Sequence, residues 1–384
     1  MVSPSFTKNN GLYTVSKDSG FECTFDEAGN LISLTKNGQT FRRSLFGYMI
    51  TFSQGEGSGN VKRIPDEESR LINAEAYRAV DEISSTVSGG NFSEIIRKIQ
   101  EKSGQIEADS IRFKSLYSRA PLVPPGLSLP IYVELSYGCD WNRCTICSSH
   151  KERHYQEKSP EEFAAHLSAV SDAFGNAISS RDSVFLGDAN AMNVDQKKLN
   201  EAISAVRNKF GKEIETSFDI FTTPKRKNMI HFQDMKRNGL TRVNVYIQSG
   251  SYKVLRILNE HTNATEVLNL VNNMKDSGLG VSLVVLAGTG GSSLSAEHIE
   301  GSANLVSQMI LDSSDTVYIS PIIESEDQSY VEQCERLGIR SMSWEEKELQ
   351  ADEIERRIRD SFRDINGSEF PAKIVKYDLR KNIY

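Results

Sequence analysis

The stretch "PIYVELSYGCDWNRCTICSSH", from Pro130 to His150, begins with a short apolar run and continues into three closely spaced cysteines. A run such as "PIYVELS" is typical of a fully buried β-strand. Cys139, Cys144 and Cys147 follow directly after it, in a chain that has five cysteines in total. The fold therefore has to account for three thiols at the end of one strand.

Further apolar runs of the same kind follow along the chain. They are "SVFLG" from Ser183, "ETSFDIFTT" from Glu215, "RVNVYIQ" from Arg242, "GVSLVVLAG" from Gly280 and "DTVYISPI" from Asp315. Each predicts a buried strand, and an amphipathic stretch separates each strand from the next.

The amphipathic stretches carry helix start and stop signals. Ser159 and Glu162 form a capping box around Pro160, and Asn263 and Glu266 repeat the box. Glycines stand where helices are expected to end, at Gly211, Gly239 and Gly278. Buried strands that alternate with helices predict a parallel sheet with right-handed crossovers. We therefore expect an α/β fold, a partial (β/α)6 TIM-like barrel, whose working residues lie at the C-terminal ends of the strands.

The segments on either side of the barrel have different residue patterns. Residues 21–52 alternate apolar and polar side chains around "EAGN" and "KNGQ", which predicts a small β-meander, and one or two helices are expected between Pro65 and Gln105. The proline-rich stretch 117–130 predicts a linker. A charged helix with an apolar stripe and a basic, strand-like tail are expected at the C-terminus. The expected division is a β-rich and helical extension at 1–118, the barrel at 119–323 and a helical extension with a tail at 324–384.

The predicted C-terminal helix begins at Trp344, and its apolar stripe consists of Leu349, Ile354, Ile358 and Phe362.

Composition limits the class of protein. The formal net charge is -7 in 384 residues, so the chain lacks the overall basic balance of a nucleic-acid binder. No apolar run approaches the ~20 residues that span a bilayer, and the first residues lack a signal pattern. We expect a cytoplasmic protein with no membrane contact. An odd number of cysteines, three of them clustered, favours a metal or redox role over a disulfide framework.

Three interpretations of the cysteine cluster remain open on the residues alone. The cysteines could be buried small apolar residues, although polar and charged residues stand between them. They could hold a structural zinc ion with His150 as a fourth ligand, although no second pair of ligands is present. They could instead hold an iron-sulfur cluster, for which thiolates are the usual ligands. Three thiolates would leave one iron of a four-iron cluster free to bind a substrate or cofactor.

The cysteine triad after the first strand of a repeating β/α unit resembles the radical S-adenosylmethionine (radical SAM) superfamily. The resemblance extends from about Pro121 to Ile322. The chain departs from the usual spacing, because four residues instead of three separate Cys139 from Cys144. It also has Ile146 where the superfamily usually has an aromatic residue beside the cofactor. The resemblance implies a [4Fe-4S] cluster on Cys139, Cys144 and Cys147.

The later strands resemble the motifs with which the superfamily binds S-adenosylmethionine. "VFLGDANAM" implies that Gly187, Asp188 and Asn190 hold the amino group of the cofactor, and Ser217 matches a polar position that faces it. The segment after "RVNVYIQ" implies that Gln248 and Ser249 face the ribose and methionine portions. "VSLVVLAGTGG" implies that Ala287 and Gly288 lie close to the adenine.

The position that is usually basic in relatives is Glu260 here, so the partner of the cofactor carboxylate has to come from elsewhere, with Arg256 or Lys225 as candidates.

The resemblance implies an enzyme that cleaves S-adenosylmethionine reductively and abstracts hydrogen with the resulting 5'-deoxyadenosyl radical. Its expected partners are a small-molecule substrate and an external electron donor of the flavodoxin or ferredoxin type. We expect a small metabolite or a natural-product intermediate as substrate. Two alternatives stay open, a radical SAM enzyme that modifies RNA or a peptide and a non-catalytic module held together by zinc. The other two cysteines, Cys23 and Cys334, are expected in the core.

Overall fold

The computed structural model describes residues 4–18, 20–53, 61–84, 92–117, 121–147, 150, 153–220, 227–260, 262–324, 329–381 and 384. The chain forms two compact units. The first, called here the N-terminal unit, consists of residues 1–132, 165–183 and 380–384. The second, called here the sheet unit, consists of residues 133–164 and 184–379.

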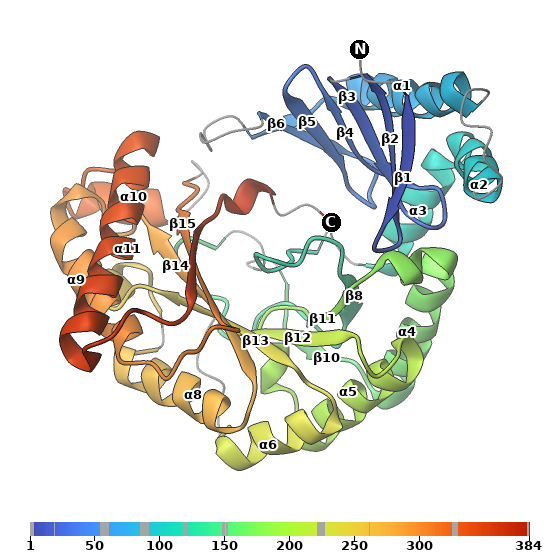
Figure 1. Ribbon diagram of the computed structural model, residues 1–384. Helices are drawn as coiled ribbons and strands as arrows, with labels where there is room; N and C mark the ends of the chain where they lie inside the picture. Colours follow the sequence, from blue (N-terminus) through green and yellow to red (C-terminus); the bar gives the residue numbers. More distant parts are fainter. Residues whose placement is uncertain are drawn as a thin grey trace. The chain divides into compact units, whose positions relative to one another are not determined.

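An antiparallel sheet of seven strands, paired in chain order, forms the main part of the N-terminal unit (Figure 1). The strands are β1 (Ser5–Asn9), β2 (Leu12–Asp18), β3 (Phe21–Phe25), β4 (Leu31–Lys36), β5 (Gln39–Arg43), β6 (Met49–Ser53) and β7 (Lys62–Ile64). The helices are α1 (Asp66–Ser84), α2 (Ser93–Ser103) and α3 (Ile106–Leu116). The hairpins expected at "EAGN" and "KNGQ" join β3 to β4 and β4 to β5, which confirms both. The sequence analysis did not predict β1, β2 and β7.

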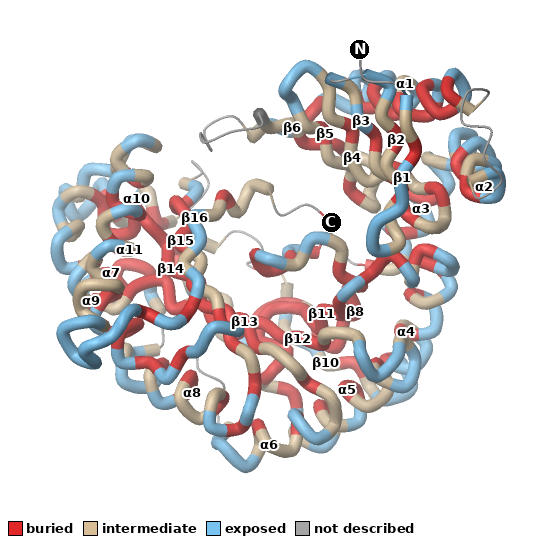
Figure 2. The backbone as a smooth tube through the Cα atoms, viewed as in Figure 1, coloured by how far each residue is buried: buried red, intermediate tan, exposed pale blue. Residues whose placement is uncertain are grey.

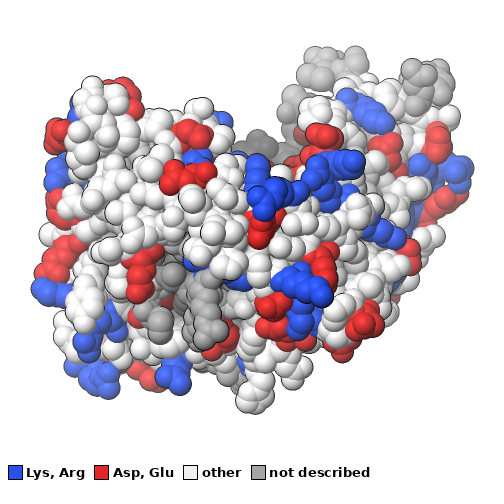
Figure 3. All heavy atoms as spheres, turned by 90° about the horizontal axis from the view of Figure 1, so that it is seen from below, with Lys and Arg blue, Asp and Glu red and all other residues white. Residues whose placement is uncertain are grey.

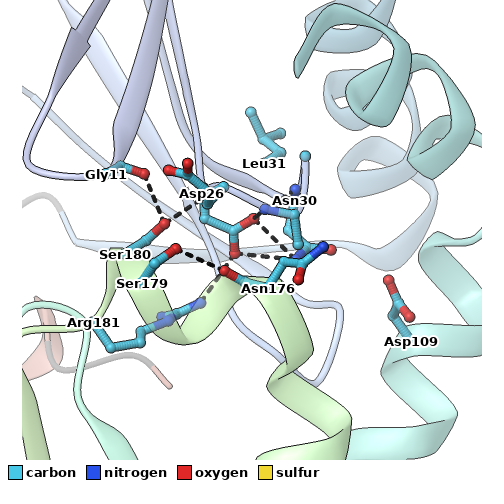
Figure 4. A network of polar contacts seen from close by, with 12 residues as sticks. Gly11, Asp26, Asn30, Leu31, Asp109, Asn176, Ser179, Ser180 and Arg181 are labelled. Carbon is cyan, nitrogen blue, oxygen red and sulfur yellow. Dashed lines mark hydrogen bonds and ion pairs between the residues drawn. The ribbon is translucent and has the colours of Figure 1, made fainter. Parts of the chain in front are cut away.

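A buried polar network holds the turn between β3 and β4 against the 3-10 helix η2 (Gly175–Ser180), as Figure 4 shows. Asp26 accepts hydrogen bonds from the backbone and side chain of Asn30 within the turn. The Arg181 guanidinium lies 3.1 Å from the Asp26 carboxylate, and both side chains are almost fully buried. The Ser180 hydroxyl donates to the carbonyl of Gly11 over 2.7 Å. Residues far apart in the sequence thus share one charged contact inside the N-terminal unit.

A second sheet of seven strands belongs mainly to the sheet unit, with the order β16-β15-β14-β13-β12-β11-β8. The strands are β8 (Ile131–Glu134), β11 (Ser183–Gly187), β12 (Glu215–Ile220), β13 (Arg242–Gln248), β14 (Gly280–Ala287), β15 (Thr316–Pro321) and β16 (Lys373–Lys376). All pairings from β12 to β16 are parallel. The six predicted runs form β8 and β11 to β15 in chain order, and the strand-like tail adds β16. The expected α/β fold with a parallel sheet is confirmed.

Helices follow the strands and cover one face of this sheet. They are α4 (Pro160–Phe174), α5 (Gln196–Phe210), α6 (Met229–Asn238), α7 (Tyr252–Ile257), α8 (Ala264–Asp276), α9 (Ser295–Ser307), α10 (Ser329–Arg336) and α11 (Trp344–Asn366). Figure 1 shows α5, α6, α8 and α9 along the outer face of the sheet. A short antiparallel pair, β9 (Ser136–Tyr137) and β10 (Gln156–Glu157), lies beyond the end of β8.

The predicted helix signals are confirmed by their hydrogen bonds. At the start of α4, the Ser159 N–H donates to the Glu162 carboxylate over 2.7 Å, and the Glu162 N–H donates to the Ser159 hydroxyl over 3.2 Å. Asn263 and Glu266 make the same reciprocal pair at the start of α8. Gly211 ends α5, and its N–H donates to the carbonyl of Arg207. These contacts are local, so the sequence alone suffices to place them.

The two faces of the parallel sheet differ in chemistry. In β13, Val243, Val245 and Ile247 are buried and apolar, which suits packing under helices. Asn244 and Tyr246 alternate with them and therefore point to the opposite, inner face. Burial is concentrated along these strands, as the red segments of Figure 2 show. The inner face is thus partly polar.

The apolar stripe predicted for α11 is correct at Ile354 and Ile358, which are buried, but wrong at Leu349, which is exposed. The buried face of α11 instead includes Lys347 and Gln350. Both polar side chains are buried because they have partners there. Lys347 donates to the carbonyl of Ile322 over 3.1 Å, and Gln350 accepts from the N–H of Gly288 over 2.6 Å.

Among the described residues, no helix has the length and apolar character needed to cross a bilayer.

Candidate active site

The cysteine loop begins directly after β9, at the C-terminal edge of the parallel sheet. Cys139 is buried, whereas Cys144 and Cys147 are half-buried. Gly138, which precedes the loop, has φ +67°, and a Cβ atom there would lie 2.9 Å from the carbonyl oxygen of Arg153. Only glycine fits this conformation and this close approach. The chain can therefore turn sharply from the strand into the loop.

The middle of the loop is fixed to the segment at the end of α7. The Thr145 N–H donates to the carbonyl of Leu258 over 3.0 Å, and its hydroxyl donates to the carbonyl of Ile257 over 2.9 Å. The Trp141 indole N–H donates to the carbonyl of Asn259 over 3.0 Å. Three hydrogen bonds thus join the loop after the first strand to the helix after β13.

The sulfur of Cys139 accepts hydrogen bonds from the loop and from Asn190. The Asn142 N–H lies 3.5 Å from Sγ, and the Asn190 side-chain amide lies 3.4 Å from it. The amide of Asn190 also donates to the Asp140 carboxylate over 3.0 Å. Burial raises the pKa of the Cys139 thiol, and the N–H donors oppose that rise. Such donors stabilise the thiolate form, which is the form that binds metal.

Cys144 contacts a different part of the site. Its thiol is hydrogen-bonded to Glu260, and the Glu260 carboxylate accepts from the Gln248 side-chain amide over 2.6 Å. Burial is the main cause that raises the pKa of both Cys144 and Glu260. A β-bulge precedes Gln248, whose φ is +54°, and bulges often redirect side chains beside active sites. The contacts link the cysteine loop to the end of β13.

Asp188 lies just past the end of β11 and joins several basic and polar groups. Its carboxylate lies 3.0 Å from the Arg153 guanidinium and 3.6 Å from Nδ1 of His150. It also accepts from the Gly138 N–H over 3.3 Å. The predicted site residue Asp188 is therefore brought to the base of the cysteine loop.

Ser249 is buried, and it is held by a histidine that the sequence analysis did not select. Its hydroxyl lies 2.8 Å from Nδ1 of His298 and accepts from the Ser251 N–H over 3.0 Å. Nε2 of His298 lies 2.8 Å from the carbonyl oxygen of Leu286, so Nε2 carries the proton and Nδ1 accepts from Ser249. Burial lowers the pKa of His298 to about 4. A neutral imidazole thus connects the end of β13, the end of β14 and α9.

The remaining predicted residues lie at or near strand ends. Gly187 ends β11, and its carbonyl accepts from the Leu135 N–H over 2.6 Å. Ala287 ends β14 and is fully buried. Gly288 follows with φ +95°, and a Cβ atom there would meet Ile322 and Lys347 within 3.0 Å.

Two further predicted residues have apolar or interior surroundings. Ile146 packs against an apolar cluster that includes Val254, Ile257 and Ile322. Ser217 is fully buried in β12, and no group among the described residues forms a hydrogen bond with its hydroxyl.

The three cysteines do not yet form a closed set of ligands. No group of three or more His, Cys, Asp and Glu side chains in the described part of the chain is arranged to hold a metal ion. The three cysteines nevertheless fit an iron-sulfur cluster, which cysteine thiolates hold. They lie on one loop, and N–H donors point at the Cys139 sulfur. The two isolated cysteines, Cys23 and Cys334, lie in separate apolar clusters, as expected for core residues.

Of the two candidates for a basic partner of the cofactor carboxylate, Arg256 lies on α7 and contacts the Tyr252 hydroxyl over 3.2 Å. Lys225 lies outside the described residues. Sequence reasoning did not select Arg153 or His298. Neither stands in a recognisable motif, and their partners Asp188 and Ser249 are 35 and 49 residues away.

Comparison with protein families gives one match. Residues 133–306 match the family described as the Radical SAM superfamily. No curated protein matches the chain.

Solved structures include distant likenesses. Coproporphyrinogen III oxidase from Escherichia coli, a radical SAM enzyme, is 14% identical with a TM-score of 0.44, over 66% of this chain and 56% of that one. The FeFe-hydrogenase maturase HydG from Carboxydothermus hydrogenoformans is 15% identical with a TM-score of 0.42, over 81% and 76% of the two chains. Spore photoproduct lyase, in complex with dinucleoside spore photoproduct, is 15% identical with a TM-score of 0.47, over 67% and 79%. The match thus spans little more than half of the oxidase, and likenesses this distant carry no argument about substrate.

Proposed function

We propose that the chain cleaves S-adenosylmethionine reductively at a [4Fe-4S] cluster and abstracts hydrogen from a small metabolite or natural-product intermediate. The match of residues 133–306 to the Radical SAM superfamily supports this proposal. The observation that carries the proposal is the position of the cysteine loop. Contacts of Cys139 with Asn190, and of Cys144 with Glu260 and Gln248, connect the loop to the ends of β11 and β13. The match to a superfamily of enzymes also disfavours the alternative of a non-catalytic module held together by zinc.

Cys139, Cys144 and Cys147 would hold the cluster, which when bound supplies the electron that splits S-adenosylmethionine into methionine and the 5'-deoxyadenosyl radical. Cys144 would lose its hydrogen bond to Glu260 when its thiolate binds iron. The N–H groups of Asn142 and Asn190 would continue to donate to the Cys139 sulfur, which tunes the reduction potential.

The ends of three strands would hold S-adenosylmethionine. Gly187, Asp188 and Asn190 would bind the amino group, Gln248 and Ser249 the ribose and methionine portions, and Ala287 and Gly288 the adenine. The side-chain oxygen Oε1 of Gln248 is buried and has no hydrogen-bond partner in the described part of the chain, so we expect it to accept from a ligand. Arg153, which lies beside Asp188, is a further candidate for the cofactor carboxylate.

The electron would come from a small donor of the flavodoxin or ferredoxin type.

Acidic and basic side chains are interspersed on the face drawn in Figure 3, and the net charge of the chain is -7. This charge pattern favours a small-molecule substrate over RNA.

The test is product analysis of the anaerobically reconstituted protein with dithionite and S-adenosylmethionine. We expect 5'-deoxyadenosine and methionine to be released slowly even without the substrate. S-adenosylhomocysteine as the main product would indicate methyl transfer, and methylthioadenosine would indicate transfer of the aminocarboxypropyl group. Either result would overturn the reaction class.

Cysteine variants test the cluster assignment separately. Replacement of Cys139, Cys144 or Cys147 by alanine is expected to abolish cluster absorption and product release. Cys23→Ala and Cys334→Ala serve as matched controls that retain about four iron and four sulfide per chain, the content of a [4Fe-4S] cluster. A redox-active cluster in Cys144→Ala would contradict the assignment, and one zinc without sulfide would contradict the cluster itself.

A further inference from the structure

The inner face of the parallel sheet carries a polar cluster below the ends of β12 and β13. Asp219 of β12 pairs in register with Asn244 of β13, so both side chains point to the same face. Tyr246 follows Asn244 by two residues and shares that face. Asn244 and Tyr246 both interact with the Asp219 carboxyl.

Two oxygens of this cluster are buried without a hydrogen-bond partner. They are Oδ1 of Asp219 and Oδ1 of Asn244, on side chains that are 2% and 1% exposed. The orientation of the Asn244 amide is fixed, because its Nδ2 donates to the carbonyl of Phe218 over 3.3 Å. A buried acceptor left without a donor is unfavourable. Neither oxygen accepts a hydrogen bond from another group among the described residues.

The charge of Asp219 is also unmatched. In the part of the chain that the structure describes, no Lys, Arg or His side chain forms an ion pair with it, although other buried acids here have such partners. Burial raises the pKa of Asp219 well above its ordinary value, and the neighbouring Asp188 adds to the rise. A buried carboxylate is stable only when a cation or several donors face it.

Aromatic side chains flank the cluster along the same face. Tyr246 of β13 and Tyr318 of β15 both pair in register with Val284, so their side chains lie on one face. The ring of Tyr318 lies 5.8 Å from that of Tyr377 in an edge-on arrangement. All three tyrosines are only half-buried. Aromatic faces favour cations.

We propose that Asp219, Asn244 and Tyr246 bind the primary ammonium group of the substrate. A primary ammonium has three N–H donors and one positive charge. The cluster offers the matching acceptors, which are the two unpaired oxygens and the Tyr246 hydroxyl, together with one unmatched acidic group. The inference rests on the proposed function, because it names the substrate class of the same site.

The position of the cluster distinguishes this group from the amino group of S-adenosylmethionine. Apart from Ser217, which lies two residues before Asp219 in β12, the residues predicted to contact the cofactor lie at or beyond the strand ends, for example Asp188 and Gly288. Asp219 and Asn244 lie within their strands, and parallel register places them deeper along the inner face. The substrate ammonium would therefore be held on the inner side of the cofactor.

The experiment measures binding of matched amines and alcohols to the reconstituted holoenzyme with S-adenosylmethionine. The probes are n-butylamine with n-butanol, putrescine with 1,4-butanediol, and lysine with its 6-hydroxy analogue. We expect at least one amine to bind about ten- to a hundred-fold more tightly than its alcohol, the range for a hydrogen bond to a charged group. Asp219→Asn is expected to abolish this preference.

Asp364→Asn, at an exposed position of α11, is the matched control and should keep the preference. The unfolding temperature of Asp219→Asn verifies its fold. Equal binding of amines and alcohols, absence of amine binding to the wild-type protein, or an undiminished preference in Asp219→Asn would each overturn the proposal. Binding does not require turnover. Amine selectivity without release of 5'-deoxyadenosine would therefore refute the proposed function alone, whereas release without selectivity would refute the ammonium site alone.

Discussion

His298 is buried, neutral and fixed in one tautomer by Ser249 and Leu286. Its contact is with Ser249, which is predicted to face the cofactor, so His298 acts as a positioning residue for Ser249. The close packing behind it reinforces this role, because a Cβ atom on Gly250 would lie 2.0 Å from the carbonyl oxygen of Gly301. A single imidazole thus determines where a predicted contact to the cofactor lies.

The pKa of His298 predicts a loss of stability in acid. Its folded pKa is about 4 and its ordinary value is 6.5, so the unfolded chain binds the proton more tightly between these values. The contribution of His298 is therefore complete above pH 6.5 and declines as the pH falls toward 4. The difference corresponds to ~3 kcal/mol in the free energy of unfolding. Chemical denaturation of the wild type and His298→Gln between pH 7.5 and 4 should show the stability gap narrowing, and a constant gap would contradict the assignment.

Asp219 predicts the opposite dependence on pH. Its folded pKa lies above its unfolded value of 3.8, so the folded chain binds the proton more tightly and loses stability as the pH rises above 3.8 toward the folded pKa. Tyr246, Asn244 and Asp188 are the polar groups that face it. Without a ligand, Asp219→Asn should be more stable than the wild type at pH 7, and the gain should shrink near pH 3. A variant less stable than the wild type at pH 7 would indicate a structural role for the carboxylate.

Among the helices, α8 provides a direct test of a local signal. Asn263 caps its first turn, and its side chain accepts from the Glu266 N–H over 3.0 Å. Asn263→Ala is expected to lower the free energy of unfolding by ~1 kcal/mol, because the N–H loses its acceptor. Asn269→Ala, at an exposed position of the same helix, should be neutral or slightly stabilising since alanine has the higher helix propensity. Equal effects of the two changes in urea denaturation would mean that the cap contributes nothing.

The same contrast between local and distant contacts explains how much the sequence could predict. Capping boxes, hairpins and the order of six buried strands depend on neighbours within a few residues, and the structure confirms them. The contact of Cys139 with Asn190 joins residues 51 positions apart, and that of Ser249 with His298 joins residues 49 apart. Sequence periodicity carries no signal for such pairs, so the predicted set contained Cys139, Asn190 and Ser249 without the contact between the first two, and it lacked His298. Leu349 was misplaced because a polar residue with a buried partner can take the place of an apolar one.

At the scale of the whole molecule, the N-terminal unit consists of three separated parts of the chain. The ion pair of Asp26 and Arg181 joins two of these parts, because the two residues are 155 positions apart in the sequence. Removal of one partner leaves the other charge buried and uncompensated, which typically costs ~3–5 kcal/mol.

Arg181→Ala should therefore reduce the free energy of unfolding by about that amount. Arg97→Ala, which removes an exposed pair with Glu101 in the same unit, should change it by ~0.5 kcal/mol or less. Guanidinium denaturation of both variants provides the measurement. Similar small effects would show that the Asp26 charge is compensated without Arg181.

The wide separation of Asp26 and Arg181 also has a consequence for synthesis. A ribosome adds ~5–20 residues per second, so Asp26 leaves it on the order of 10 s before Arg181 does. During that interval the nascent β3–β4 hairpin lacks the Arg181 guanidinium that pairs with its carboxylate. The backbone and side-chain amides of Asn30 are available at once, since they emerge four residues later. The turn can thus shield its own charge cotranslationally, and the N-terminal unit is complete only after residues 165–183 and 380–384 have also been made.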